Sequence, residues 1–283
     1  MTSSNLILNR VFSKNTLKAL LDGDKNAGNA YYAVIKRYLI SSLNKKNKDL
    51  ISEIYKTLKH TYRNEYYYKN TLLNNLLFKF HNPLKTTALT EIPVSKSIAD
   101  FILLNGKATV YEIKTELDTF DRLNSQLINY YKAFDNVCVV VPEIKLETIK
   151  NKLKNHNVGI YYISKRGALK KYREPISYIA ELDYDTIFKI LRKYEYENII
   201  SKYYVLPDVS QFKYYQACKE LFKTIPLDKV YSDFKVQLKQ RTKINLELIQ
   251  NVPKEIKSVV YFSKLKETEY KTLETFLERK FGG

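Results

Sequence analysis

The stretch from Ala88 to Thr115 reads ALTEIPVSKSIADFILLNGKATVYEIKT, and it decides the fold. It contains three short runs rich in β-branched and aromatic residues, ALTEIPV, SIADFILL and ATVYEIKT, which are typical of strands. Asn105-Gly106 lies between the second and third runs, and this dipeptide favours a tight hairpin turn. The stretch therefore predicts three consecutive strands, the last two joined as a hairpin.

Two more apolar runs follow, NVCVVVP at 136–142 and VGIYYIS at 158–164. A segment with helical character precedes each of them, at 118–134 and at 146–155. With a helix before the first strand, the order becomes helix, three strands, helix, strand, helix, strand. This order predicts an α/β protein with a mixed sheet covered by helices.

The flanks of this core have a different pattern. Between residues 29 and 80 there is no proline, and Tyr, Leu and Ile recur at the three- and four-residue spacing of helices. After Lys165 the chain is predicted to become helical again, with KYREPIS at 171–177 as a linker. We therefore predict an N-terminal helical region at 1–59, a core at 60–165 and a C-terminal helical region at 166–283.

The composition limits the class of protein. The chain has 283 residues, of which 45% are hydrophobic, and this excludes a disordered chain. Its two cysteines, Cys138 and Cys218, cannot form a zinc cluster by themselves or support a disulfide scaffold, which indicates a reducing compartment. The opening MTSSNLILNRVF lacks the apolar segment of a signal peptide, and no apolar run approaches the ~18 residues of a membrane span. These features predict a cytoplasmic protein without membrane attachment.

The chain carries a net charge of +18, and this charge predicts a polyanionic partner, above all DNA. A compositional bias toward Lys, as in AT-rich genomes, is the alternative reading of the same count. Residues 36–85 carry 11 basic and 3 acidic groups, whereas 86–165 carry 10 and 9. The candidates for binding the nucleic-acid backbone come from the first segment: Lys36, Arg37, Lys45, Lys46, Lys59 and Arg63.

Acidic residues gathered in the nearly neutral middle suggest a metal site. Asp100 lies at the head of the second predicted strand, and Glu112-Ile113-Lys114 lies within the third. Glu112 and Lys114 share one face, since side chains alternate along a strand, and the hairpin would bring Asp100 beside Glu112. Two carboxylates and a backbone carbonyl suit Mg²⁺, and a nearby lysine can act on a water or a phosphate. The alternative is an ordinary solvated strand face.

At this point the sequence resembles the PD-(D/E)XK nuclease superfamily, in Ala99-Asp100 followed by Glu112-Ile113-Lys114. The resemblance covers about residues 60–165, and Ala99 stands where the family name has Pro. Further residues match one mostly uncharacterised bacterial branch: Glu91, Glu116, Asp118, Arg122, Leu123, Gln126 and Tyr130. The resemblance implies a restriction-endonuclease-like αβββαβ core and Mg²⁺- or Mn²⁺-dependent hydrolysis of phosphodiester bonds.

The resemblance also implies roles for individual residues. Asp100, Glu112 and the backbone carbonyl of Ile113 would bind the metal, and Lys114 would be the catalytic lysine. Gln126 would contact the phosphate or its water, unless it is an ordinary polar residue on a helix.

Two further acidic residues match positions that help to bind the metal in similar nucleases. Glu65 is one of them, although it could instead form a salt bridge with Arg63 or Lys69. Glu91 opens the first strand and could instead be simply exposed. Asp118 and Arg122, spaced i, i+4, are expected to pair on one helix face in a structural role.

The sequence thus predicts a Mg²⁺-dependent nuclease acting on DNA, with defence against foreign DNA as one setting. The alternative is a catalytically inactive nuclease-like fold that binds nucleic acid, another protein or a second copy of itself. A protein of the membrane surface ranks last, because no concentrated cationic amphipathic helix is present.

Overall fold

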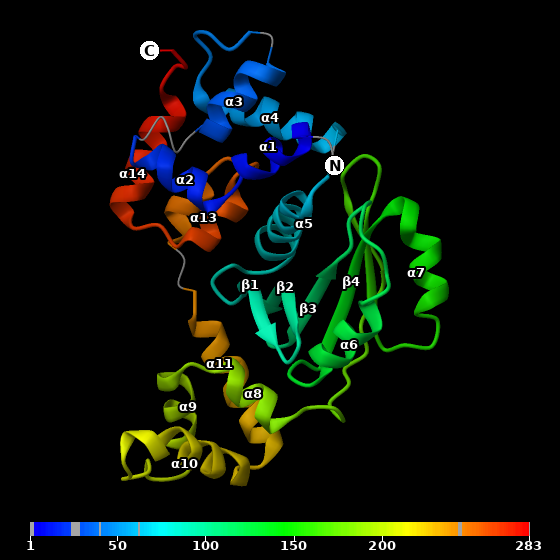
Figure 1. The fold of residues 1–283 in the computed structure, drawn as a ribbon, viewed down its shortest axis with the longest axis vertical. Helices are drawn as coiled ribbons and strands as arrows, with labels where there is room; N and C mark the ends of the chain where they lie inside the picture. The colour runs from blue at the N-terminus through cyan, green and yellow to red at the C-terminus, as the bar shows by residue number, and fades with distance from the viewer. Residues whose placement is uncertain (1–2, 24–28, 40, 62, 243–244, 283) are drawn as a thin grey trace. The chain divides into compact units, whose positions relative to one another are not determined.

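A computed structural model describes residues 3–23, 29–39, 41–61, 63–242 and 245–282 (Figure 1). The chain forms two compact units. One unit contains the sheet and spans Lys85–Lys243; the other is helical and combines Met1–Leu84 with Ile244–Gly283.

The sheet unit is built on six strands that lie in chain order across one sheet. The first three strands run antiparallel, the third to fifth run parallel, and the sixth is antiparallel to the fifth. The strands are β1 (Thr87–Val94), β2 (Ser97–Leu104), β3 (Ala108–Ile113), β4 (Asn136–Pro142), β5 (Gly159–Ile163) and β6 (Leu169–Arg173).

The sequence pattern explains the positions of these strands. β3 and β4 lie in the middle of the sheet and are buried along their whole length. β4 is parallel to both of its neighbours and carries the continuous apolar run VCVVV that is typical of such a strand. The turn between β2 and β3 is the predicted one: the N–H of Asn105 donates to the carbonyl of Lys107, and Gly106 takes a φ of 94°. A residue with a Cβ would be strained at that φ, so glycine suits the turn.

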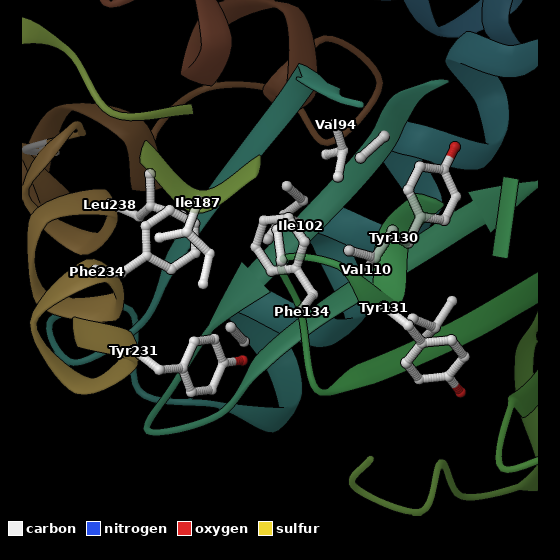
Figure 2. Close-up of a cluster of buried hydrophobic side chains, with 14 of the residues drawn as sticks. Val94, Ile102, Val110, Tyr130, Tyr131, Phe134, Ile187, Tyr231, Phe234 and Leu238 are labelled. Atoms are coloured by element: carbon white, nitrogen blue, oxygen red, sulfur yellow. The ribbon is translucent and has the colours of Figure 1, made fainter. Parts of the chain in front are cut away.

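One hydrophobic core lies between the sheet and its helices (Figure 2). The sheet contributes Val94, Ile102 and Val110, and Phe134 lies in the loop between α6 and β4; the other labelled side chains come from helices packed against the sheet. The helices of this unit are α6 (Leu123–Tyr131), α7 (Leu146–Lys152), α8 (Tyr184–Ile190), α9 (Lys193–Ile200), α10 (Gln211–Thr224) and α11 (Leu227–Gln240), with a short 3₁₀ turn, η2 (Glu143–Lys145).

The helical unit joins the two ends of the chain. The buried amide of Asn47 donates to the carbonyls of Phe276 and Arg279 at 2.9 and 3.0 Å, which ties the start of α4 to the end of α14. The elements are α1 (Ser3–Val11), α2 (Lys14–Leu21), α3 (Asn29–Tyr38), α4 (Asn47–Thr61), α5 (Glu65–Leu72), the π-helix η1 (Leu73–Phe80), α12 (Leu246–Gln250), α13 (Lys257–Ser263) and α14 (Glu267–Glu278).

The predicted α/β class, with a mixed sheet flanked by N- and C-terminal helices, is confirmed. One element was predicted wrongly: the chain after Lys165 first forms β6, so the first part of KYREPIS belongs to a strand. The two units also divide the chain at different places from the predicted boundaries at 59/60 and 165/166. Among the helices of the described residues, none has the length and apolar character needed to cross a membrane.

Candidate active site

Strands β2 and β3 separate at Asp100. Their pairing ends with Phe101 opposite Tyr111, and the next pair in this register would be Asp100 and Glu112. In place of a ladder bond to β2, the N–H of Ile113 donates to Oδ2 of Asp100 at 2.8 Å. The N–H and C=O of one strand residue point to the same side, so the Ile113 carbonyl also points toward β2. The Asp100 carboxylate and the Ile113 carbonyl therefore lie where the sheet opens, next to Glu112 in the chain.

Glu112 and Lys114 form a buried ion pair. The Nζ atom of Lys114 lies 2.8 Å from Oε1 of Glu112, and their side chains are 7% and 2% exposed. The same Nζ donates to Oε1 of Gln126 on α6 at 2.8 Å. The structure thus brings Asp100, Glu112, Lys114 and Gln126 together, and Glu112 and Lys114 do not lie on a solvated strand face.

Tyr130 holds the other oxygen of Glu112. Its hydroxyl lies 2.5 Å from Oε2 of Glu112 and 2.8 Å from the carbonyl oxygen of Ile98. Its ring belongs to the core cluster, with the hydroxyl directed away from Ile102 and Phe134 (Figure 2). Burial and the Glu112 carboxylate hold the pKa of Tyr130 far above its ordinary value, so the hydroxyl keeps its proton. Sequence reasoning gave Tyr130 no role, although its i, i+4 spacing from Gln126 was the available signal.

The segment after Lys114 is fixed by Asp118 and Lys145. Oδ2 of Asp118 accepts hydrogen bonds from the N–H and the hydroxyl of Thr115, both at 2.7 Å. The expected pairing of Asp118 with Arg122 on one helix is wrong, because α6 begins at Leu123 and Asp118 lies before it.

Lys145 is a site residue that sequence reasoning missed. It donates to the carbonyl of Thr115 at 2.8 Å and to that of Asp118. Burial lowers the pKa of Lys145. The signal in the sequence was a lysine shortly after the buried run VCVVVP.

The other two metal-binding candidates differ in position: Glu65 lies outside the sheet unit, whereas Glu91 lies on the strand next to Asp100. Glu65 starts α5 in the helical unit, is exposed, and pairs with Lys69 at 2.6 Å, which is the alternative expected from the sequence. Glu91 lies on β1 opposite Asp100 of β2 in the strand register, but these two residues are skipped in the pairing of β1 with β2. Its φ is 57° and its side chain is exposed.

The six basic candidates all lie in the helical unit, and several have partners there. Lys45 pairs with Glu53 at 2.8 Å, and Lys46 pairs with Glu278 at 2.6 Å. The guanidinium of Arg63 donates to the carbonyl of Lys59 at 3.2 Å. Lys36 and Arg37 are exposed at the end of α3.

The donor set at the opening fits a hard divalent cation. In the described part of the chain, no three or more His, Cys, Asp or Glu side chains form a group that could hold a metal. Two carboxylates and the Ile113 carbonyl remain, and such oxygen donors together with water are what Mg²⁺ and Mn²⁺ take. Both Glu112 oxygens are hydrogen-bonded, but each carboxylate oxygen has a second lone pair for a cation.

Comparison with known proteins gives one match. The sequence model of the family described as Bacteriophage P4 protein cII matches residues 58–276. No curated protein and no solved structure matches the chain. Because the family match covers most of the chain, including the whole sheet unit, the protein belongs to the Bacteriophage P4 protein cII family.

Proposed function

We propose that this chain is a Mg²⁺-dependent nuclease that hydrolyses phosphodiester bonds of DNA, with a site like that of the PD-(D/E)XK nucleases. The observation that carries the proposal is the buried Glu112–Lys114 pair beside Asp100, at the point where β2 and β3 part. Mn²⁺ would serve in place of Mg²⁺ at such oxygen donors. The absence of disulfides fits a cytoplasmic setting, since both cysteines are free and buried.

The burial of this pair supports a chemical role. Removing two opposite charges from water is costly, and apolar side chains of similar volume often stabilise a fold as well or better. Val110 and Val139 surround this part of the sheet with apolar surface, where a further apolar residue would pack equally well. A buried Glu–Lys pair next to a second carboxylate is therefore better explained by function.

Each residue has a distinct task in the proposed reaction. Asp100, Glu112 and the Ile113 carbonyl would hold Mg²⁺, which when bound supplies Lewis-acid stabilisation of the charge that develops on the phosphate. The Lys114 ammonium group would orient the attacking water from its position beside Glu112. Gln126 fixes the direction of the Lys114 side chain, and Tyr130 fixes that of Glu112.

Cleavage assays test the proposal directly. Purified protein is incubated with plasmid, linear and single-stranded DNA in Mg²⁺, Mn²⁺ or EDTA. We expect cleavage with either metal, none in EDTA, and none in Asp100→Ala, Glu112→Ala or Lys114→Ala. Glu147→Ala is the matched control, because this glutamate pairs with Lys150 on the exposed surface of α7. Full activity in Glu112→Ala would show that the metal site is assigned wrongly.

A second function has one observation in its favour. The alternative is an inactive binding module, in which the Glu112–Lys114 pair would be purely structural. It is favoured by the fact that no three or more His, Cys, Asp or Glu side chains of the described residues form a group that could hold a metal. Thermal melting separates the two functions. In a nuclease, Mg²⁺ raises the melting temperature of the wild type and not that of Asp100→Ala, because a ligand stabilises the state that binds it. In the inactive module neither protein responds.

A further inference from the structure

The basic residues near the candidate site are concentrated in one short segment. Residues 145–173 contain nine Lys and Arg and one acidic residue, Glu147, which gives a net charge of +8. This segment covers α7, β5 and β6, so its charge belongs to the same unit as Asp100 and Glu112. It is denser in charge than 36–85, where the same +8 is spread over a longer stretch.

Part of this charge lies at the same edge of the sheet as the candidate site. Strands β3, β4 and β5 are parallel, so their carboxyl ends share one edge. Lys114 follows β3, Lys145 follows β4, and Lys165 with Arg166 follows β5. Since neighbouring strands are about 4.8 Å apart, the turn after β5 lies about 10 Å from the end of β3.

Hydrogen bonds connect these three points along the edge. Lys145 donates to the carbonyl of Thr115 at 2.8 Å, which joins the end of β4 to the end of β3. The N–H of Lys165 donates to Oε2 of Glu143 at 2.8 Å, which joins the end of β5 to the end of β4. The order Lys114, Lys145, Lys165 therefore follows the sheet edge without a gap.

The turn that carries Lys165 and Arg166 is well defined. The N–H of Gly167 donates to the carbonyl of Ser164 at 2.8 Å, and the N–H of Ala168 donates to Oγ of Ser164 at 3.0 Å. Gly167 has a φ of 87°, the conformation that a three-residue hairpin loop places on glycine. Lys165 and Arg166 are exposed in this turn, and Lys170 is exposed at the start of β6.

We propose that the phosphate backbone of the nucleic acid runs from the Glu112–Lys114 centre past Lys145 to the turn between β5 and β6, where Lys165, Arg166 and Lys170 hold it. The inference rests on the proposed function and adds the path of the substrate. A strand of about three nucleotides spans the distance, at ~3.4 Å per nucleotide. Contacts of this kind bind the backbone whatever the base sequence.

A pair of double variants tests the path. Arg166→Ala with Lys170→Ala removes two charges at the carboxyl edge. Lys152→Ala with Lys154→Ala removes two exposed charges at the opposite edge of the sheet. These lysines flank Leu153, whose carbonyl accepts a hydrogen bond from Arg173. Arg173 pairs with Ile160 near the start of β5, so this contact marks the amino-terminal edge of the parallel strands. Binding of a labelled DNA duplex is measured in EDTA, so that no cleavage interferes, at a series of salt concentrations.

The slope of log affinity against log salt should become shallower by about 2 in the Arg166/Lys170 variant, one unit for each lost phosphate contact. The Lys152/Lys154 variant should keep the wild-type slope. Equal changes in both variants, or no change in the first, would overturn the path. Cleavage by the wild type in Mg²⁺ is measured separately. If binding follows the expected pattern but no cleavage occurs, the nuclease proposal is contradicted and the proposed path remains. If cleavage occurs but the two double variants do not differ in salt dependence, only the proposed path is contradicted.

Discussion

At the scale of single residues, the hydroxyl of Tyr130 has a clear task. It donates to the buried carboxylate of Glu112, whereas the hydroxyl of its neighbour Tyr131 is buried without a hydrogen-bond partner among the described residues. Tyr130→Phe should therefore lower the free energy of unfolding by about 1–3 kcal/mol, the cost of depriving a buried charged group of a donor. Tyr131→Phe is the matched control and should be neutral or slightly stabilising.

The loss in Tyr130→Phe should not vary between neutral and mildly alkaline pH. Burial and the Glu112 carboxylate raise the pKa of Tyr130, so its folded-state proton stays in place throughout this range. Urea denaturation at several pH values measures both variants. Equal effects of the two substitutions would mean that Tyr130 does not support Glu112.

Gln126 is the second residue with a testable role. Its Oε1 accepts from Nζ of Lys114, so we expect it to position the lysine in addition to any contact with the phosphate. Gln126→Ala should slow cleavage roughly ten- to a hundredfold, the equivalent of losing a hydrogen bond to a charged group at ~1.5–3 kcal/mol. Mg²⁺ binding, followed by the shift in melting temperature, should change far less. Asn124→Ala, on the exposed face of the same helix, should cleave like the wild type.

Some residues of the site could be found in the sequence and others could not. Asp100, Glu112 and Lys114 follow from strand alternation and a tight hairpin, which are local rules. The contact of Lys145 with Thr115 depends on how the end of β4 packs beside the end of β3, and no local spacing encodes that. Glu65 was a metal-ligand candidate from the sequence, but its salt bridge with Lys69, one helix turn away, accounts for its position without a metal.

At the scale of elements, β6 shows why part of the sheet was missed. β1 to β5 contain apolar runs that predict a buried strand, but β6 has the sequence LKKYR and is mostly exposed. Its strand conformation comes from pairing with Tyr161 and Tyr162 of β5, a tertiary contact. The same boundary divided the basic segment 145–173 in two, and its first part was then counted within 86–165, where 10 basic and 9 acidic groups nearly cancel.

The ion pair between α9 and the end of α11 gives a prediction at this scale. Arg241 contacts Glu195 at 2.5 Å, and their side chains are 5% and 0% exposed. Arg241→Met should lower the free energy of unfolding by about 3–5 kcal/mol, because it leaves a buried carboxylate without its cation. Lys202→Met, which removes the more exposed pair with Asp233, should cost less than about 1 kcal/mol. A small loss in Arg241→Met would show that Glu195 is solvated.

The same pair predicts a pH dependence. Burial acts to raise the pKa of Glu195, but hydrogen bonds from Arg241 and from the N–H of Arg192 prevail and hold this pKa below its ordinary range. A carboxylate whose pKa is lowered by folding stabilises the folded state at any pH above the ordinary pKa of glutamate. This stabilisation is lost as the pH falls through the lower pKa of the folded state. Glu195→Gln should therefore lose less stability than the wild type on acidification below the ordinary glutamate range. Parallel acid-unfolding curves would contradict this.

At the scale of the whole molecule, we expect DNA binding through the basic residues to be separable from cleavage at the candidate site. The net charge of +18 arises from both units, whereas the proposed chemistry depends on Lys114 and the carboxylates of Asp100 and Glu112. Exposed basic groups such as Lys36 on α3 and Arg166 after β5 are separate from the side chains that would bind the metal. A variant that cannot cleave should therefore still bind DNA.

Glu112→Gln is the variant that tests this separation, because it removes the charge of the proposed ligand and keeps its shape. We expect it to bind a labelled duplex about as tightly as the wild type, with affinity that falls steeply as salt is added. The slope of log affinity against log salt should be several units, since each phosphate contact contributes about 0.9 through the release of counterions. A flat plot for both proteins would mean that the net charge reflects composition and that the partner is not a nucleic acid. A steep plot for the wild type and weak binding by Glu112→Gln would instead mean that the substrate is held mainly through the metal.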